Sequence, residues 1–181
     1  MKYYSTNRKA SEVSLKEAVI KGLAPDKGLY MPEYLPELPK AFFDNIAKMS
    51  LQEMSSVVAE ALFGDDIEPE TLKRIVYDTL SFDIPIHHVA KNRYTLELYH
   101  GPTLAFKDVG ARFMARMLGY FNAKDEDKRP VNVLVATSGD TGSAVANGFL
   151  GVEGVHVYVL YPKGKVSEIQ ESQFTTLGRN I

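Results

Sequence analysis

One lysine, Lys107, lies where a charged amine is disfavoured. An apolar, strand-like run over 94–99 leads to a turn at Gly101-Pro102, and apolar residues with helical spacing begin near Ala105. Lys107 therefore falls in the first turn of a predicted helix, where the helix dipole and apolar neighbours both favour an uncharged amine. A neutral amine can attack a carbonyl group and form a Schiff base. Lys107 is thus a candidate catalytic residue; the ordinary alternative is a side chain extended into water.

A second candidate site is Thr137–Gly142, which joins an apolar strand to a helical pattern. Small residues allow the backbone to approach a ligand closely, and the N–H groups at a helix start attract anions. The alternative is an ordinary strand–helix turn in which Asp140 or Thr141 is the N-cap residue. The segment is neither a dinucleotide-binding fingerprint nor a P-loop.

Three other patterns carry weaker signals. Lys165, in a basic loop after the last predicted strand, is a candidate phosphate ligand, with solvated lysines as the alternative. The tetrapeptide Asp140–Ser143 matches that of aspartic proteases, but it occurs once and opens a helix, so we regard the match as accidental. The four histidines are scattered without metal-ligand spacing, which predicts no metal site.

The element pattern changes near residue 84 and predicts two domains, 1–83 and 84–181. The first is mostly helical, with capping boxes beginning at Ser14 and Ser50. The second alternates strand-like and helical runs, which indicates an α/β fold with an open parallel sheet. Its last two strands are almost wholly apolar, so we expect both of their faces to be covered. The predicted elements of the second domain are strands 84–89 and 94–99, helix 105–122, strand 131–136, helix 141–150 and strand 155–161.

Composition narrows the class of protein. The chain has 181 residues, 45% of them hydrophobic and 24% charged, and its net charge is -2. It has no basic block, so we expect no nucleic-acid partner. The absence of cysteine excludes disulfides and thiolate chemistry. No apolar run approaches the ~20 residues that span a bilayer, and no signal peptide is evident, so we expect no membrane association and a cytoplasmic location.

The two loops together are similar to those of the threonine synthase family, pyridoxal 5'-phosphate (PLP) enzymes of fold type II. The resemblance runs in order along nearly the whole chain. The segments that carry it are 28–32, 96–108, 137–142, 161–165 and 177–178.

The resemblance implies a role for each candidate residue. Lys107 would carry PLP covalently, Phe106 and Asp108 would position that lysine, and Asp140 would lie beside the ring oxygen of PLP. Lys165 would bind the phosphate of the substrate, O-phospho-L-homoserine, which the family converts with water to L-threonine and phosphate. The substrate carboxylate would be bound by Thr137, Ser138, Gly139 and Thr141.

The chain departs from the family in length. The glycine-rich loop for the PLP phosphate and the group facing the pyridine nitrogen have no counterpart in the sequence. We therefore expect an N-terminal piece with an incomplete sheet that lacks synthase activity alone. An alternative is a non-catalytic fragment that associates with another chain through an exposed sheet edge, which also allows an oligomer. A threonine or serine dehydratase, or a cysteine synthase, is a further alternative, although those relatives usually carry Asn where this chain has Asp140.

Overall fold

The computed structural model describes residues 1–127 and 129–181. The chain divides into two compact units, Met1–Asp78 and Thr79–Ile181, which are considered separately below. The boundary that the sequence predicts after residue 83 falls inside the second unit. Among the described residues, no helix combines the length and apolar character needed to cross a bilayer.

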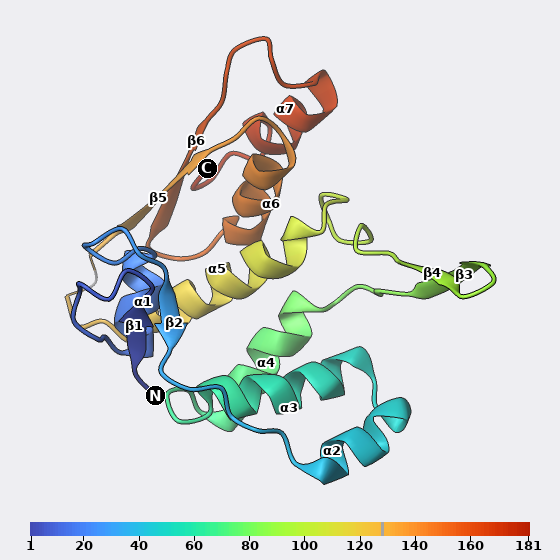
Figure 1. The fold of residues 1–181 in the computed structure, drawn as a ribbon. Helices are drawn as coiled ribbons and strands as arrows, with labels where there is room; N and C mark the ends of the chain where they lie inside the picture. The colour runs from blue at the N-terminus through green and yellow to red at the C-terminus, as the bar shows by residue number, and fades with distance from the viewer. Residues whose placement is uncertain (128) are drawn as a thin grey trace. The chain divides into compact units, whose positions relative to one another are not determined.

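The first unit is mostly helical, as predicted. Its helix ends follow the capping signals, since the Ser50 hydroxyl and the Glu53 carboxylate form a reciprocal capping box. At Ser14 only the hydroxyl takes part, because Glu17 instead pairs with Lys21. The elements are β1 (Tyr3–Ser5), α1 (Leu15–Lys21), β2 (Tyr30–Pro32), α2 (Lys40–Asn45), the 3-10 helix η1 (Ile46–Lys48), α3 (Leu51–Phe63) and α4 (Pro69–Thr79), which ends at the boundary (Figure 1).

A single carboxylate, Asp26, fastens the loops around the antiparallel β1–β2 pair. The Ser5 hydroxyl and the Gly28 N–H donate to Asp26 Oδ1 at 2.6 and 3.0 Å. The N–H groups of Lys9 and Ala10 donate to Oδ2 at 2.9 and 3.0 Å. These donors, the Ser5 hydroxyl first among them, lower the pKa of Asp26 from 3.8 to about 2.

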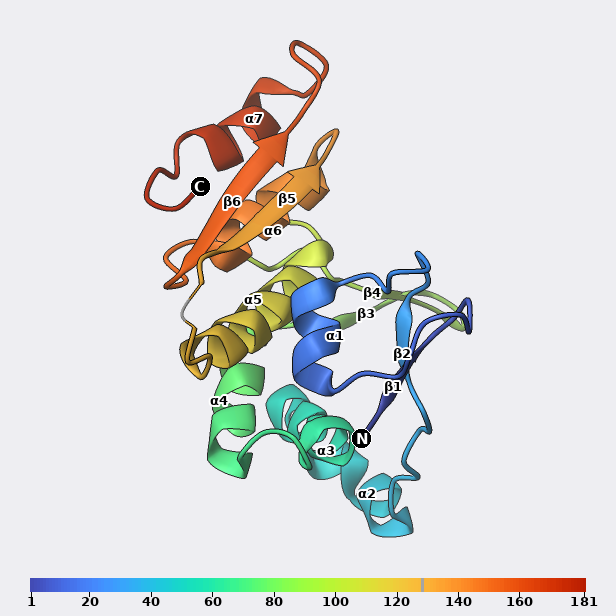
Figure 2. The same cartoon turned by 90° about the vertical axis from the view of Figure 1, so that its left-hand side faces the viewer.

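The second unit contains four strands and three helices among the described residues. They form an antiparallel hairpin, a parallel strand pair and the helices that pack beside that pair (Figures 1 and 2). The elements are β3 (Ile86–Ala90), β4 (Arg93–Leu96), α5 (Lys107–Ala123), β5 (Val131–Ala136), α6 (Asp140–Phe149), β6 (Val155–Leu160) and α7 (Glu168–Thr175).

The prediction that the first two strands of this unit belong to the parallel sheet is wrong. β3 and β4 pair with each other, antiparallel, and project away from the helices of their unit (Figure 1). Only Lys91 and Asn92 separate them, and Lys91 adopts a positive φ of 46°. A two-residue connection permits an antiparallel hairpin, whereas parallel neighbours require a crossover of a dozen residues or more. β4 also ends at Leu96, before the predicted end at Tyr99.

The parallel pair is β5–β6, joined through α6, as predicted for an open α/β sheet. The expectation that both faces are covered is wrong, because the helices of this unit lie on one side of the pair (Figure 2). Val155 and Val157 are 1% and 3% exposed, whereas Leu134 and Tyr158 are 69% and 54% exposed. The strands are therefore apolar on both faces but buried on one.

Close packing of α5 against α6 sets the position of the site. Ala115 on α5 and Ala144 on α6 are completely buried. A Cβ atom added at Gly148 would lie 3.0 Å from the backbone carbonyl carbon of Ala111, so only hydrogen fits there without displacement. Small residues thus allow the two helix backbones to approach closely.

We expect Asp26→Asn to reduce stability at neutral pH and to flatten the acid limb of the unfolding curve. The pKa of Asp26 is lower in the folded state than in the unfolded state, so its stabilisation is present above pH 3.8 and is lost as the pH falls towards about 2. Asparagine does not ionise, and it accepts hydrogen bonds through one atom instead of two. Denaturant unfolding at a series of pH values measures the difference. If the stability of the two proteins falls equally steeply at acid pH, the predicted role of Asp26 is wrong.

We expect Gly148→Ala to destabilise the fold by roughly 1–3 kcal/mol, because the added methyl group meets the α5 backbone, which cannot move aside cheaply. Gly110→Ala is the matched control within α5. A Cβ atom at Gly110 meets nothing within 4 Å, so this change should stabilise the helix by about 1 kcal/mol. Equal effects of the two changes in urea denaturation would refute the packing argument.

Candidate functional site

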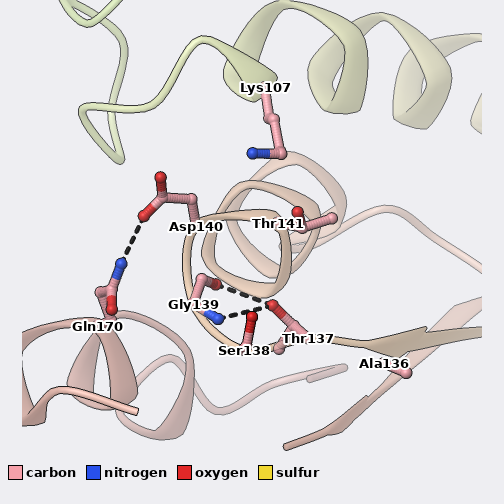
Figure 3. Close-up of a pocket in the computed structure, with 8 residues that line it drawn as sticks. All are labelled: Lys107, Ala136, Thr137, Ser138, Gly139, Asp140, Thr141 and Gln170. Carbon is pink, nitrogen blue, oxygen red and sulfur yellow. Dashed lines mark hydrogen bonds between the residues drawn. The ribbon is translucent and has the colours of Figure 1, made fainter.

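The two loops singled out in the sequence lie on one pocket of about 340 Å³ in the second unit. One wall is the start of α5, and the other is the turn from β5 into α6 together with α7 (Figure 3). The structure therefore brings Lys107 to the predicted anion-binding loop. The residues that line the pocket are Lys107, Ala136, Thr137, Ser138, Gly139, Asp140, Thr141 and Gln170.

Asp108 shapes the loop that places Lys107 at the first position of α5. Its carboxylate is 0% exposed and accepts from Thr103 N at 2.9 Å and Thr103 Oγ1 at 2.6 Å. Gly101 passes so close that an added Cβ would lie 2.5 Å from Asp108 Oδ2. Asp108 thus stabilises the loop before α5 through hydrogen bonds from Thr103 and does not line the pocket.

The Lys107 side chain is partly buried and extends over the start of α6 (Figure 3). Its Nζ atom lies 4.5 Å from the centroid of the Phe106 ring. Phe106 is 60% exposed and lies outside the pocket lining.

Thr137 caps α6, where Asp140 or Thr141 was the expected N-cap residue. The N-cap position itself is Gly139, which has no side chain to form a cap. Thr137 Oγ1 accepts from the N–H groups of Gly139 and Gly142 at 3.0 and 2.9 Å and donates to the Gly139 carbonyl at 3.0 Å. A Cβ atom at Gly142 would lie 2.3 Å from Thr137 Cγ2, so the threonine fits only against glycine.

The start of α6 presents polar groups to the pocket. Asp140 and Thr141 occupy its first two positions, where backbone N–H groups have no partner inside the helix. Such groups, at the positive end of the helix dipole, favour a bound anion. The carboxylate of Asp140 and the hydroxyls of Ser138 and Thr141 lie beside them (Figure 3).

Sequence analysis did not identify Gln170, which also lines the pocket. Its Nε2 donates to Asp140 Oδ1 across 30 residues of sequence (Figure 3). The residue lies in the first turn of α7, whose N-cap residue is Ser167. The sequence signal at Ser167 indicates a helix start but says nothing about the place where that start docks.

The candidate phosphate ligand Lys165 and the histidine near the second predicted strand, His100, lie elsewhere in the unit. Lys165 is exposed in the loop between β6 and α7 and is absent from the pocket lining. His100 donates through Nε2 to Glu97 Oε2, 2.7 Å away, and this hydrogen bond is the main cause that lowers the pKa of Glu97. Among the described residues, no group of three or more His, Cys, Asp or Glu side chains is placed to hold a metal ion.

The pocket adjoins the carboxyl end of β5, the strand that leads into Thr137. Ligands of open α/β sheets bind at this edge. Fold and pocket together define the class as an α/β domain in which a lysine lines a pocket beside a helix start.

Comparison with known proteins finds threonine synthases that are similar to this chain along its whole length. Residues 2–80 match the family model described as the threonine synthase N terminus. The chain is 44% identical to threonine synthase from Escherichia coli K12 over 181 residues, covering 100% of this chain and 41% of the relative. The chain is 37% identical to the threonine synthase from Saccharomyces cerevisiae, and the match covers 96% of this chain and 38% of the relative.

Solved structures agree. The crystal structure of Escherichia coli threonine synthase superposes with a TM-score of 0.89 at 43% identity, covering 100% of this chain and 41% of that one. The PLP-bound threonine synthase from Brucella melitensis superposes with a TM-score of 0.88 at 34% identity, covering 96% of this chain and 38% of that one. The predicted resemblance to the threonine synthase family is therefore confirmed, and the chain corresponds to the N-terminal part of its members. It spans about two-fifths of the length of these relatives.

We expect Thr137→Val to destabilise the second unit by roughly 1–3 kcal/mol, because the Gly139 N–H loses its acceptor and the Gly142 N–H keeps only the Gly139 carbonyl. Thr137→Ser keeps the hydroxyl and is the control, with a smaller loss from the missing methyl group. Urea denaturation of both variants measures the difference. If valine and serine cost the same, the cap contributes nothing.

Proposed function

We propose that the chain forms the N-terminal part of a PLP-dependent threonine synthase, a carbon–oxygen lyase. The reaction converts O-phospho-L-homoserine and water to L-threonine and phosphate. The observation that supports this proposal most is the single pocket shared by Lys107 and the segment 136–141. A reactive amine opposite an anion-binding helix start suits a substrate that is both an amino acid and a phosphate ester.

The donor set of the pocket fits one side of PLP. Lys107 supplies a primary amine for the aldehyde, and Asp140 supplies a carboxyl group for the neighbouring ring oxygen. The described pocket residues include no glycine-rich loop that would hold the phosphate of PLP. The proposal therefore assigns that phosphate to the part of the protein beyond the two-fifths represented by this chain.

Each pocket residue has a proposed task. PLP, when bound, supplies an electron sink for the substrate carbanion. Lys107 would hold PLP through its Nζ atom and, when its amine is free, would transfer protons at the substrate carbons. The N–H groups at the start of α6 and the hydroxyls of Ser138 and Thr141 bind the substrate carboxylate.

Binding of both substrate ends orients the reacting bonds. Lys165, in the loop that follows β6, is the proposed cation for the substrate phosphate. Holding the carboxylate at one loop and the phosphate at the other fixes the substrate over the amine. Phe106 contributes to positioning by its contact with Lys107 Nζ, and Asp108 by the loop that it holds.

The test uses the full-length protein. After incubation with PLP, reduction with borohydride and peptide mapping, we expect the label on Lys107. Lys107→Ala should lose the label and should lower phosphate release from O-phospho-L-homoserine by about a hundredfold or more, because the amine acts in both binding and proton transfer. Lys165→Ala, the matched lysine control, should retain the label. A label on another lysine of the wild-type protein would remove the basis of the proposal.

A further inference from the structure

Gln170 makes a directed contact with the candidate site through one side of its amide. Its Nε2 donates to Asp140 Oδ1, and Ser167 Oγ donates to its Oε1 at 3.0 Å. The direction of the amide follows from chemistry, since an ionised carboxylate only accepts hydrogen bonds and must face the NH₂ group. Both halves of the amide therefore have partners that hold it in one orientation.

Packing allows the amide little room to turn away. A Cβ atom at Gly139 would lie 2.8 Å from Gln170 Nε2 and 3.0 Å from Oε1, so the amide lies directly over the glycine. The buried Ser143 hydroxyl donates to the backbone carbonyl of Gln170 at 3.4 Å. Glycine at 139 thus makes room for the amide beside the carboxylate.

The helix that carries Gln170 is attached independently of the contact with Asp140. Tyr161 donates to Glu171 Oε1 at 3.0 Å, and its ring meets Phe174 edge-on with centroids 4.9 Å apart. Phe174 is buried. A substitution at Gln170 therefore leaves α7 with its main contacts.

We propose that Gln170 is a positioning residue that aims one oxygen of Asp140 at the ligand in the pocket. With Oδ1 occupied by the amide, Oδ2 points away from Gln170 (Figure 3). Oδ2 is then the oxygen left to meet a ligand, because Oδ1 already accepts a hydrogen bond. Resting on the proposed function, a proton shared between Asp140 and the phenolate-like oxygen of PLP would lie between that oxygen and Oδ2.

Substitution by asparagine separates orientation from charge. In Asp140→Asn, the Gln170 amide still requires an acceptor, so the new carbonyl oxygen faces Gln170 and the new NH₂ group faces the pocket. This NH₂ group replaces the carboxyl O–H, and PLP affinity should stay within a few-fold of that of the wild-type protein. Adding Gln170→Glu reverses the polarity, because the introduced carboxylate accepts from that NH₂ group and turns the carbonyl towards the ligand.

The experiment measures the dissociation constant of PLP for full-length variants, with their melting temperatures as a check on folding. Asp140→Asn/Gln170→Glu should bind PLP on the order of tenfold more weakly than Asp140→Asn alone, since one donor becomes an acceptor. In the background with Asp140 intact, Gln170→Glu should shift the pH midpoint of the visible absorption of bound PLP by on the order of one unit, because two carboxylates then meet.

Ile169→Glu, tested with Asp140→Asn, is the matched control. It adds the same charge in the same turn of α7, on a side chain that is 77% exposed and outside the pocket lining, and should leave PLP affinity unchanged. If Gln170→Glu does not fold, Gln170→Met takes its place, because methionine lacks a hydrogen-bond donor. With Asp140 intact, Gln170→Met should bind PLP more weakly than the wild-type protein.

Equal PLP affinity of the Asp140→Asn proteins with and without Gln170→Glu would overturn the inference and leave the proposed function standing. A wild-type protein that takes up no PLP overturns the proposed function, and the inference with it.

Discussion

The close approach of α5 and α6 is the constraint on which the candidate site depends. Lys107 is the first residue of α5 and Asp140 is the first residue of α6, so the distance between the helices sets the distance between the two functional groups. Gly148 permits this distance, since any side chain there meets the backbone at Ala111. A side chain at this position would push the two helices apart, because a packed interior contains little free volume to absorb it. The pocket is thus a consequence of helix packing more than of the loops that line it.

Within that frame, each loop is held by one side chain of its own. Asp108 accepts from Thr103 beneath the α5 loop, and Thr137 accepts from two N–H groups at the α6 turn. Gln170 and Gln173 on α7 then reach both loops, through Asp140 and the Thr103 carbonyl. Bonds of this kind order the site before a ligand arrives, which lowers the entropy cost of binding.

The sequence predicted what local patterns determine. The strand 131–136, the helix after it and the capping at Ser50 were all expected, because periodicity and caps act within a few residues. The hairpin was missed although the four residues between the predicted strands 84–89 and 94–99 are too few for parallel pairing. Gln170 was missed for a deeper reason, since its role depends on docking against residues 30 positions away. No short-range rule distinguishes it from Gln173 on the same helix.

The choice of a neutral partner for Asp140 has an electrostatic reason. Lysine or arginine in place of Gln170 would form an ion pair and hold the carboxylate in its charged form. An amide donates a hydrogen bond without adding charge, so in its proposed role Gln170 would orient Asp140 without forming an ion pair. The positive end of the α6 helix dipole lies beside the carboxylate instead, and it faces the pocket. Geometry and charge are therefore supplied by different residues, and a change at Gln170 alters the first while leaving the second in place.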